Sequence, residues 1–153
     1  MPHLLSDSGA MRLLLDLVTR DEGGRVVATA AVEWLDRRDG EWWPFVRLPV
    51  VHLQAGAAEA LVGGLRDMLQ GVAPGFSWAA AENGSVALQV GDAESGAPVV
   101  EVGIDLGAFL AESAGVPPRP GNELALFRFG GTRAELVRFA GEIEAQVRSV
   151  TEQ

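Results

Sequence analysis

Three stretches in the first third of the chain alternate apolar with other side chains, and short turn sequences separate them. They cover residues 11–20, 25–36 and 41–54, with Asp-Glu-Gly-Gly at 21–24 and Arg-Arg-Asp-Gly at 37–40 between them. A period of two is typical of strands with one buried face, because neighbouring side chains of a strand point to opposite sides. The pattern therefore predicts a meander of antiparallel strands.

The third of these stretches contains two prolines, Pro44 and Pro49. Proline has no backbone N–H to donate to a neighbouring strand, so within sheets it is confined to edge strands and bulges. We therefore expect this strand to lie at the edge of its sheet or to be bulged at its prolines.

Two later stretches, residues 57–70 and 133–150, carry apolar residues three and four positions apart. This spacing predicts helices with one buried face. The first helix contains Gly63 and Gly64, although a glycine inside a helix costs up to about 1 kcal/mol relative to alanine. We interpret the glycine pair as a place where a neighbouring element packs closely.

A second set of strands follows the first helix. Residues 76–81 and 85–90 flank Asn83-Gly84, and Asn-Gly between alternating stretches predicts a tight hairpin. The other predicted elements are strands over 98–105 and 123–129 and a short helix over 106–114 with Asp105 as its N-cap.

We expect an α+β fold with one meandering antiparallel sheet of six or seven strands, packed on one face by the helices over 57–70 and 133–150. The length of 153 residues suits a single domain, residues 1–153. A weak internal βββα repeat would divide it into halves 1–72 and 76–150, because both halves end on strand, glycine and helix.

The composition excludes several kinds of chemistry. The chain has no Cys, and all 12 of its basic residues are Arg. Disulfides, thiolate nucleophiles, Cys-based zinc sites and lysine Schiff bases are therefore excluded. The net charge of −9 and the pI of about 4.6 argue against a nucleic-acid partner, because binding nucleic acid requires a cationic surface.

The sequence also indicates where in the cell the protein is found. Its apolar stretches are shorter than the roughly 20 residues that a membrane helix needs, and the first residues lack a signal-peptide pattern. Abundant Ala, Gly, Val and Arg are typical of a GC-rich genome. We expect a cytoplasmic protein of bacterial type that binds no membrane and uses no cofactor.

The sequence FGGTRAEL, residues 129–136, raises the possibility of a phosphate site, because glycines and a hydroxyl join a strand to a helix. It lacks the lysine of a P-loop and the G-x-G-x-x-G pattern of a dinucleotide site. A capping box, in which Thr132 and Glu135 each accept the other's backbone N–H, accounts for more of the residues. We therefore assign Gly130, Gly131, Thr132 and Glu135 to a structural cap, with an anion held by neighbouring arginines as the alternative.

Candidate catalytic groups are few. His52 is alone in its strand, where a histidine is more often structural than catalytic, and no zinc-binding spacing or G-x-S-x-G elbow occurs. We predict no metal site. Asp16 and Glu33 interrupt apolar strand faces and would suit acid–base chemistry if they met. Neutralisation by Arg12 or Arg47 in a sheet-face ion pair is the simpler interpretation.

Trp42 and Trp43 are the most informative residues for function. Neighbours in a strand point to opposite faces, so helices on one face would leave one of the two rings uncovered. With Phe45 they would form an apolar, Trp-bearing sheet face for a second copy or a protein partner. A curled sheet or a covering loop is the alternative. We expect a non-enzymatic interaction domain, most simply a homodimer.

Two other functions remain open. The negative charge would suit an acidic inhibitor or immunity-type protein that binds a basic partner. A small-molecule ligand or substrate would suit a pocket between the sheet and the helices, near His52, Arg47 and Arg128.

Overall fold

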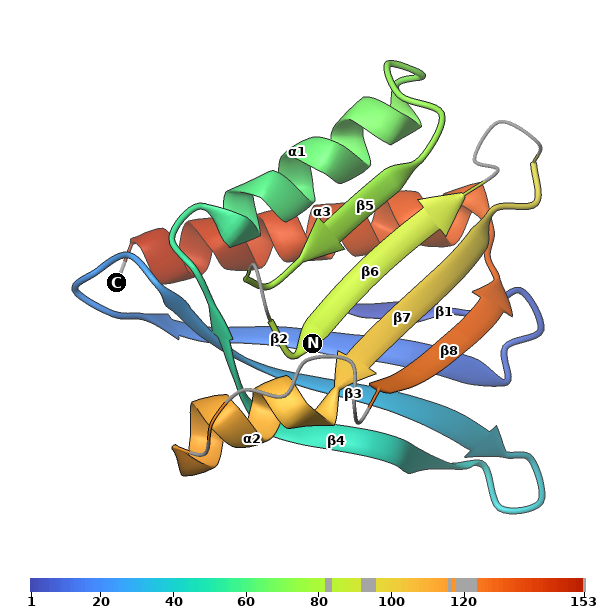
Figure 1. Cartoon of the computed structure of the whole chain (residues 1–153). Helices are drawn as coiled ribbons and strands as arrows, with labels where there is room; N and C mark the ends of the chain where they lie inside the picture. The colour runs from blue at the N-terminus through green and yellow to red at the C-terminus, as the bar shows by residue number, and fades with distance from the viewer. Residues whose placement is uncertain (82–83, 92–95, 116, 118–123, 153) are drawn as a thin grey trace.

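The computed structural model describes the whole chain except residues 82–83, 92–95, 116, 118–123 and 153. Over the described residues the chain forms two antiparallel sheets and three helices (Figure 1). The elements in chain order are β1 (His3–Leu5), β2 (Met11–Arg20), β3 (Val26–Asp36), β4 (Glu41–Leu53), α1 (Ala57–Leu69), β5 (Phe76–Ala79), β6 (Val86–Gly91), β7 (Val99–Asp105), α2 (Leu106–Ala114), β8 (Leu124–Gly130) and α3 (Arg133–Thr151).

The predicted single sheet of six or seven strands is wrong. Strands β1 to β4 form one four-stranded sheet, which we call sheet A, and β5 to β8 form another, which we call sheet B. Within each sheet every strand pairs with its neighbours in sequence. The meander is interrupted after β4 because α1 carries the chain from one layer to the other (Figure 1). A period of two identifies strands but does not specify which strands share hydrogen bonds.

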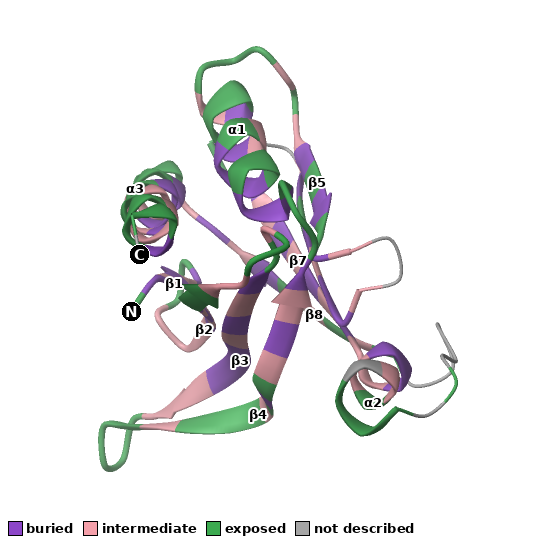
Figure 2. Cartoon of the chain, turned by 90° about the vertical axis from the view of Figure 1, so that its left-hand side faces the viewer, coloured by how far each residue is buried: buried purple, intermediate pink, exposed green. Residues whose placement is uncertain are grey.

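Each sheet contributes one face to a common core, and α1 and α3 close this core along one side (Figure 2). Leu13 and Leu15 of β2 are buried on the inner face of sheet A, and Leu88 of β6 and Val102 of β7 on that of sheet B. Helix α2 lies on the other side of the molecule, against β4 and β8. The opposite faces of both sheets therefore point outwards.

Strand β4 is an edge strand of sheet A, which confirms the expectation from its prolines. Its pairing with β3 shifts register at two places, one at Pro49 and one at Phe45, which follows Pro44. A bulge adds a residue to one strand, bends it and redirects its side chains. The prolines thus lie where the ladder of hydrogen bonds is already interrupted.

Both main helices form close to the predicted bounds. Gly64 of α1 makes room for Phe76 of β5, because a Cβ at this glycine would overlap the phenylalanine ring. The expected close packing is therefore confirmed at Gly64. At Gly63 a Cβ would meet nothing within 4 Å.

The shorter elements also follow the sequence pattern. Helix α2 has Asp105 as its N-cap, and the Asp105 carboxylate accepts the Ala108 N–H at 3.1 Å. Strands β5 and β6 pair antiparallel, although the turn residues Glu82 and Asn83 lie outside the described part. The chain thus runs twice through four meandering strands and a helix, with α2 added the second time. The single domain and its division into halves stay predictions.

Helix α3 covers the outer edge of sheet A with side-chain hydrogen bonds. Its Glu135 accepts the Leu5 N–H of β1 at 3.4 Å, and its Arg138 donates to a backbone carbonyl of the same strand. Beyond the end of β1, Gln146 accepts the Leu17 N–H of β2 at 2.8 Å. These contacts satisfy edge groups that would otherwise be open to another strand.

Candidate functional site

The two neighbouring tryptophans of β4 point to opposite sides of sheet A. Trp42 is half-buried, and the guanidinium of Arg12 lies 4.1 Å from the centroid of its ring. Trp43 pairs with Trp34 of β3 and is 46% exposed. Trp43 is therefore the more exposed of the two rings, which the sequence alone did not decide.

The bulge in β4 turns Phe45 towards the aromatic residues of neighbouring strands. Its ring centroid lies 6.4 Å from that of Trp34 and 5.5 Å from that of Phe127 in β8, yet Phe45 is still 53% exposed. Because β4 belongs to sheet A and β8 to sheet B, these rings connect the outermost strands of the two sheets.

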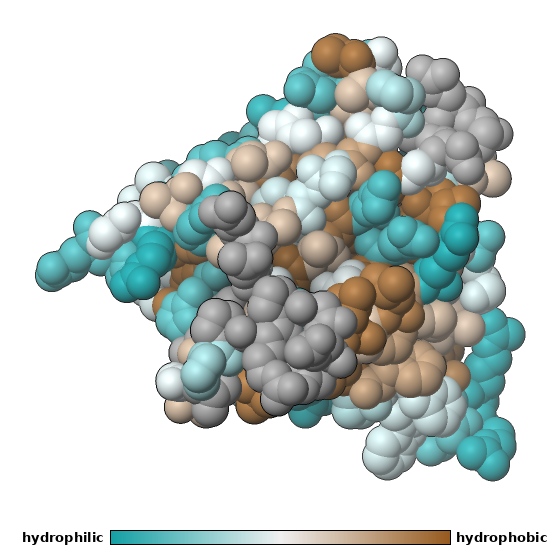
Figure 3. All heavy atoms as spheres, viewed as in Figure 1, coloured by the Kyte–Doolittle hydropathy of each residue, from teal (hydrophilic) through white to brown (hydrophobic). Residues whose placement is uncertain are grey.

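Exposed hydrophobic side chains continue from these rings across β8 and α2. Leu124 and Leu126 of β8 and Leu110 of α2 are all exposed, and α2 packs against both β4 and β8. In Figure 3, hydrophobic atoms gather over β8 and the adjoining part of β4. We call Trp43, Phe45, Leu110, Leu124 and Leu126 the apolar rim.

The sequence patterns single out only the aromatic members of the apolar rim. The three leucines were missed because each belongs to an ordinary strand or helix pattern. A signal was nevertheless present in β8, where Leu124 and Leu126 form one alternating set and Phe127 and Phe129 belong to the other. When both sets of an antiparallel strand are apolar and only one face of its sheet is packed, the other set must be exposed.

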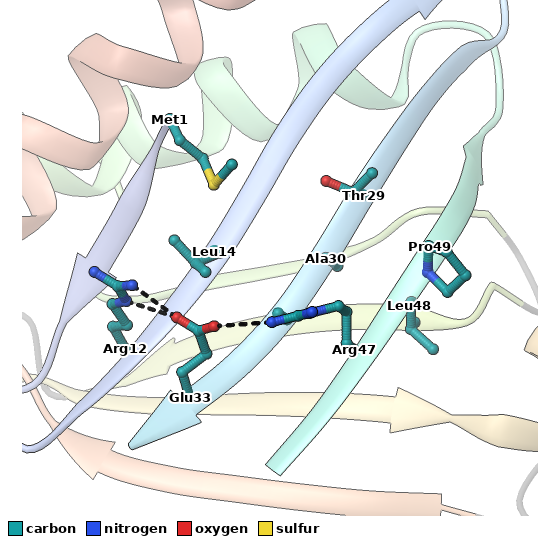
Figure 4. A pocket seen from close by; sticks show the side chains of 10 residues that line it. Met1, Arg12, Leu14, Thr29, Ala30, Glu33, Arg47, Leu48 and Pro49 are labelled. Carbon is teal, nitrogen blue, oxygen red and sulfur yellow. Dashed lines mark hydrogen bonds and ion pairs between the residues drawn. The ribbon is translucent and has the colours of Figure 1, made fainter. Parts of the chain in front are cut away.

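The outer face of sheet A contains a hollow of about 460 Å³ (Figure 4). Its walls come mainly from β2, β3 and β4 and include Leu14, Thr29, Ala31 and Pro49, together with Met1. The bulge at Pro49 borders it. The volume lies within the range of small-molecule sites.

Three charged side chains, Arg12, Glu33 and Arg47, form a row along one end of the hollow (Figure 4). Glu33 is only 5% exposed, and its Oε1 accepts from Nε and Nη2 of Arg12 at 2.9 and 2.8 Å. Its Oε2 lies 3.6 Å from Nη2 of Arg47. The interpretation of Glu33 as part of a sheet-face ion pair is confirmed. Asp16 has a separate partner, because it accepts from the Gln146 amide of α3.

The structure does not bring together the three residues of the predicted pocket. Arg47 lines the hollow, while His52 is half-buried further along β4. Arg128 lies on the outer face of sheet B, 3.8 Å from Glu101. The hollow opens on the outer face of sheet A, whereas the prediction placed a pocket between a sheet and the helices (Figure 4).

The turn before α3 contains one half of the predicted capping box. The Thr132 hydroxyl accepts the Glu135 N–H at 3.3 Å. The Glu135 carboxylate instead accepts the Leu5 N–H and pairs with Arg138. The hydrogen bond from Arg138 holds the pKa of the Glu135 carboxyl below its ordinary value. This carboxylate therefore fixes the start of α3 to β1.

Gly130 and Gly131 allow close approach of other backbone segments. The Asp7 N–H donates to the Gly130 carbonyl at 2.8 Å, and a Cβ on Gly130 would lie 2.6 Å from the Asp7 carboxylate. The Gly131 N–H donates to the Pro98 carbonyl at 2.8 Å. Because the Gly131 amide already has a partner within the chain, the glycine-rich turn serves as a structural joint in this conformation.

No protein-family model, curated protein or solved structure matches this chain. None of the helices that the structure describes is both long and apolar enough to cross a membrane. Among the described residues, no group of three or more His, Asp or Glu side chains is placed to hold a metal ion. The apolar rim and the hollow are therefore the features from which a function can be argued.

Proposed function

We propose that this protein is a non-enzymatic interaction domain that forms a homodimer through the apolar rim. The observation that carries the proposal is the exposure of Trp43 and Phe45 on an edge strand of sheet A, in contact with β8 of sheet B. Aromatic side chains are enriched among the residues that contribute most to the free energy of binding at interfaces. Two such anchors therefore suit a protein-binding surface.

The position of the apolar rim supports an interface with protein. Its residues come from three neighbouring elements, and two of these, β4 and β8, are the outermost strands of their sheets. Contiguous apolar surface of this kind is uncommon on monomers, because leaving it in water forgoes the free energy of burial. Covering it with a second protein surface recovers that free energy.

The charge distribution favours a second copy as the occupant. Two chains that each carry a net charge of −9 associate most easily where negative charge is least concentrated. Strand β8 of the apolar rim also carries Arg128, whose side chain is 70% exposed. This cation reduces the repulsion between copies, and a two-fold interface would place the same rim on both sides of the contact.

Sedimentation equilibrium over a range of protein concentrations tests the proposal. The unsubstituted protein is expected to dimerise, and Phe45→Ser to raise the dimer Kd by about 1,000-fold, because each copy loses an anchor worth about 2 kcal/mol. Val72→Ser is the control, because Val72 is also an exposed hydrophobic residue but lies in the turn after α1. Its dimer Kd is expected to equal that of the unsubstituted protein.

Two results would contradict the homodimer. One is a monomer at every concentration tested. The other is a dimer that Phe45→Ser leaves intact, since the copies would then associate through a different surface. If the protein is monomeric but Phe45→Ser abolishes binding of a purified partner, the interaction domain stands and the homodimer fails.

A further inference from the structure

The hollow on the outer face of sheet A has a charged end and an apolar end (Figure 4). The row of Arg12, Glu33 and Arg47 lies along one end, and the side chains of Leu14 and Pro49 stand above it on opposite sides. Ala31 is buried although it belongs to the outer face of the sheet, and its small side chain leaves the space open. The hollow is therefore shaped for a ligand with one polar group and an aliphatic body.

Glu33 and Arg12 form a closed pair at the charged end. Both nitrogens that Arg12 directs to Glu33 bind the same carboxylate oxygen, Oε1, and the guanidinium also stacks on Trp42. Stacking on a tryptophan face and bonding to a buried carboxylate both restrict the guanidinium. Arg12 is thus the closer of the two counter-charges of Glu33 and makes both of its hydrogen bonds to arginine.

Arg47 is held more loosely than Arg12. Its Nη2 lies 3.6 Å from Oε2 of Glu33, which is longer than a hydrogen bond, and its side chain is 64% exposed. The other N–H groups of the guanidinium therefore reach the solvent at the mouth of the hollow. With one carboxylate and two guanidiniums, the row carries a net charge of +1 in a chain whose total is −9.

We infer that this hollow binds a small aliphatic carboxylate. The ligand carboxylate accepts hydrogen bonds from the exposed N–H groups of Arg47, for which the planar fork of arginine is the best match among side chains. The aliphatic body lies against Leu14, Ala31 and Pro49. A cationic ligand is disfavoured, because it would have to displace Arg47 and lie next to Arg12.

The inference is independent of the homodimer proposal. Trp43 and Phe45 of the apolar rim point away from the outer face of sheet A, and neither lines the hollow. A ligand in the hollow and a second copy on the rim would therefore occupy different surfaces.

A two-dimensional NMR titration with octanoate tests the inference. Octanoate is expected to shift the backbone amide signals of Thr29 and Ala31, and these shifts yield the Kd. Arg47→Gln is expected to weaken binding by about tenfold or more, because a charge-assisted hydrogen-bond pair is lost. The matched control is Arg128→Gln on the other sheet. Arg128 is similarly exposed and is also loosely paired with a glutamate, at 3.8 Å. Octanoate binding is expected to be unchanged in that variant and in Phe45→Ser.

Three further probes separate the parts of the ligand. Acetate has the carboxylate but lacks the long alkyl chain. Octanol has the alkyl chain without a charge, and octylamine has it with a positive charge. Each is expected to bind more weakly than octanoate. The inference is overturned if octanoate does not shift the two amides, or if Arg47→Gln binds as tightly as the unsubstituted protein. It is also overturned if Arg128→Gln weakens binding equally, or if any of the three probes matches octanoate.

Discussion

Gly63 and Gly64 are neighbours in α1 but meet different surroundings. A side chain at Gly64 would overlap the Phe76 ring, whereas one at Gly63 would enter open space. We expect Gly64→Ala to lower the free energy of unfolding by about 1–3 kcal/mol through overpacking. Gly63→Ala should raise it by up to about 1 kcal/mol, because alanine favours the helix. Chemical denaturation checks both values, and equal effects of the same sign would contradict the assigned packing.

Glu33 offers a second test at the level of one side chain. It is nearly buried and holds Arg12, which is itself mostly covered, so Glu33→Gln leaves a guanidinium without its counter-charge. We expect a loss of about 2 kcal/mol in the free energy of unfolding. Glu101→Gln on sheet B removes the partner of Arg128 from a pair that is exposed and 3.8 Å long, and should cost less than about 0.5 kcal/mol. Urea unfolding near neutral pH compares them, and similar costs would show that burial of the pair is unimportant.

The ion pair at Glu33 was predictable because its causes are local to one hairpin. An acidic residue on an otherwise apolar strand face requires a partner, and Arg12 lies directly opposite Glu33 in the register of β2 and β3. The partner of Asp16 was not predictable, because Gln146 lies 130 positions further along the chain. No strand register connects those two residues.

At the scale of elements, α3 has two functions: it packs on the core and it covers the edge of sheet A. Its Glu135 carboxylate has a pKa below the ordinary value of 4.5, mainly because Arg138 donates a hydrogen bond to it. A group with a lowered folded-state pKa stabilises fully above its unfolded pKa. That stabilisation is lost as the pH falls through the folded-state pKa.

The comparison of Glu135→Gln with the unsubstituted protein measures this contribution. At pH 7 the variant should be less stable by about 1 kcal/mol, since the charge-assisted contacts are replaced by neutral ones. The difference should persist down to about pH 4.5 and shrink below it, because the unsubstituted carboxyl then becomes neutral as well. Thermal unfolding between pH 3 and pH 7 follows it. A difference that grows as the pH falls would contradict the assigned role.

The joints between elements illustrate what short-range pattern can predict. Asp105 and Thr132 cap helices through residues three positions away, and both hydrogen bonds occur. The second half of the capping box was wrong because a residue distant in sequence, Leu5, offers its N–H to the same Glu135 carboxylate. The ion pairs on the surface of α3 also include one local partner and one that is distant in sequence. Arg138 pairs with Glu142 one turn further along the helix, whereas Glu144 pairs with Arg66 of α1.

At the scale of the whole molecule, the error in the sheet count has a physical cause. Hairpins bring together strands that follow one another, and alternation reports this correctly for each strand pair. Two meanders can join edge to edge in one sheet or stack as two layers. Which of these forms depends on the helix that connects them and on how the inner residues of each meander are buried. The apolar rim depends on that stacking, because Phe45 and Phe127 are neighbours only when the sheets are separate layers. The contact between β4 and β8 was therefore not predictable from the alternation in either strand.

The overall charge gives a prediction that belongs to the assembled molecule. Two copies with a net charge of −9 repel one another at long range, and salt screens this repulsion. Raising the NaCl concentration from about 0.05 M to about 0.5 M should therefore tighten the proposed dimer several-fold, while it shortens the Debye length to a few ångströms. Sedimentation equilibrium at both concentrations checks this. Dissociation on adding salt would mean that ion pairs, and not apolar contacts, hold the copies together.

Because α3 covers the edge of sheet A, that edge is exposed during synthesis of the chain. The groups that Glu135, Arg138 and Gln146 satisfy precede them by 129 to 135 positions along the chain. During synthesis, β1 to β4 leave the ribosome with one edge bare, and they remain so until α3 has been translated. A nascent chain stalled before α3 would present that edge to other nascent chains. The nascent chain is thus open to mispairing at this edge until α3 emerges.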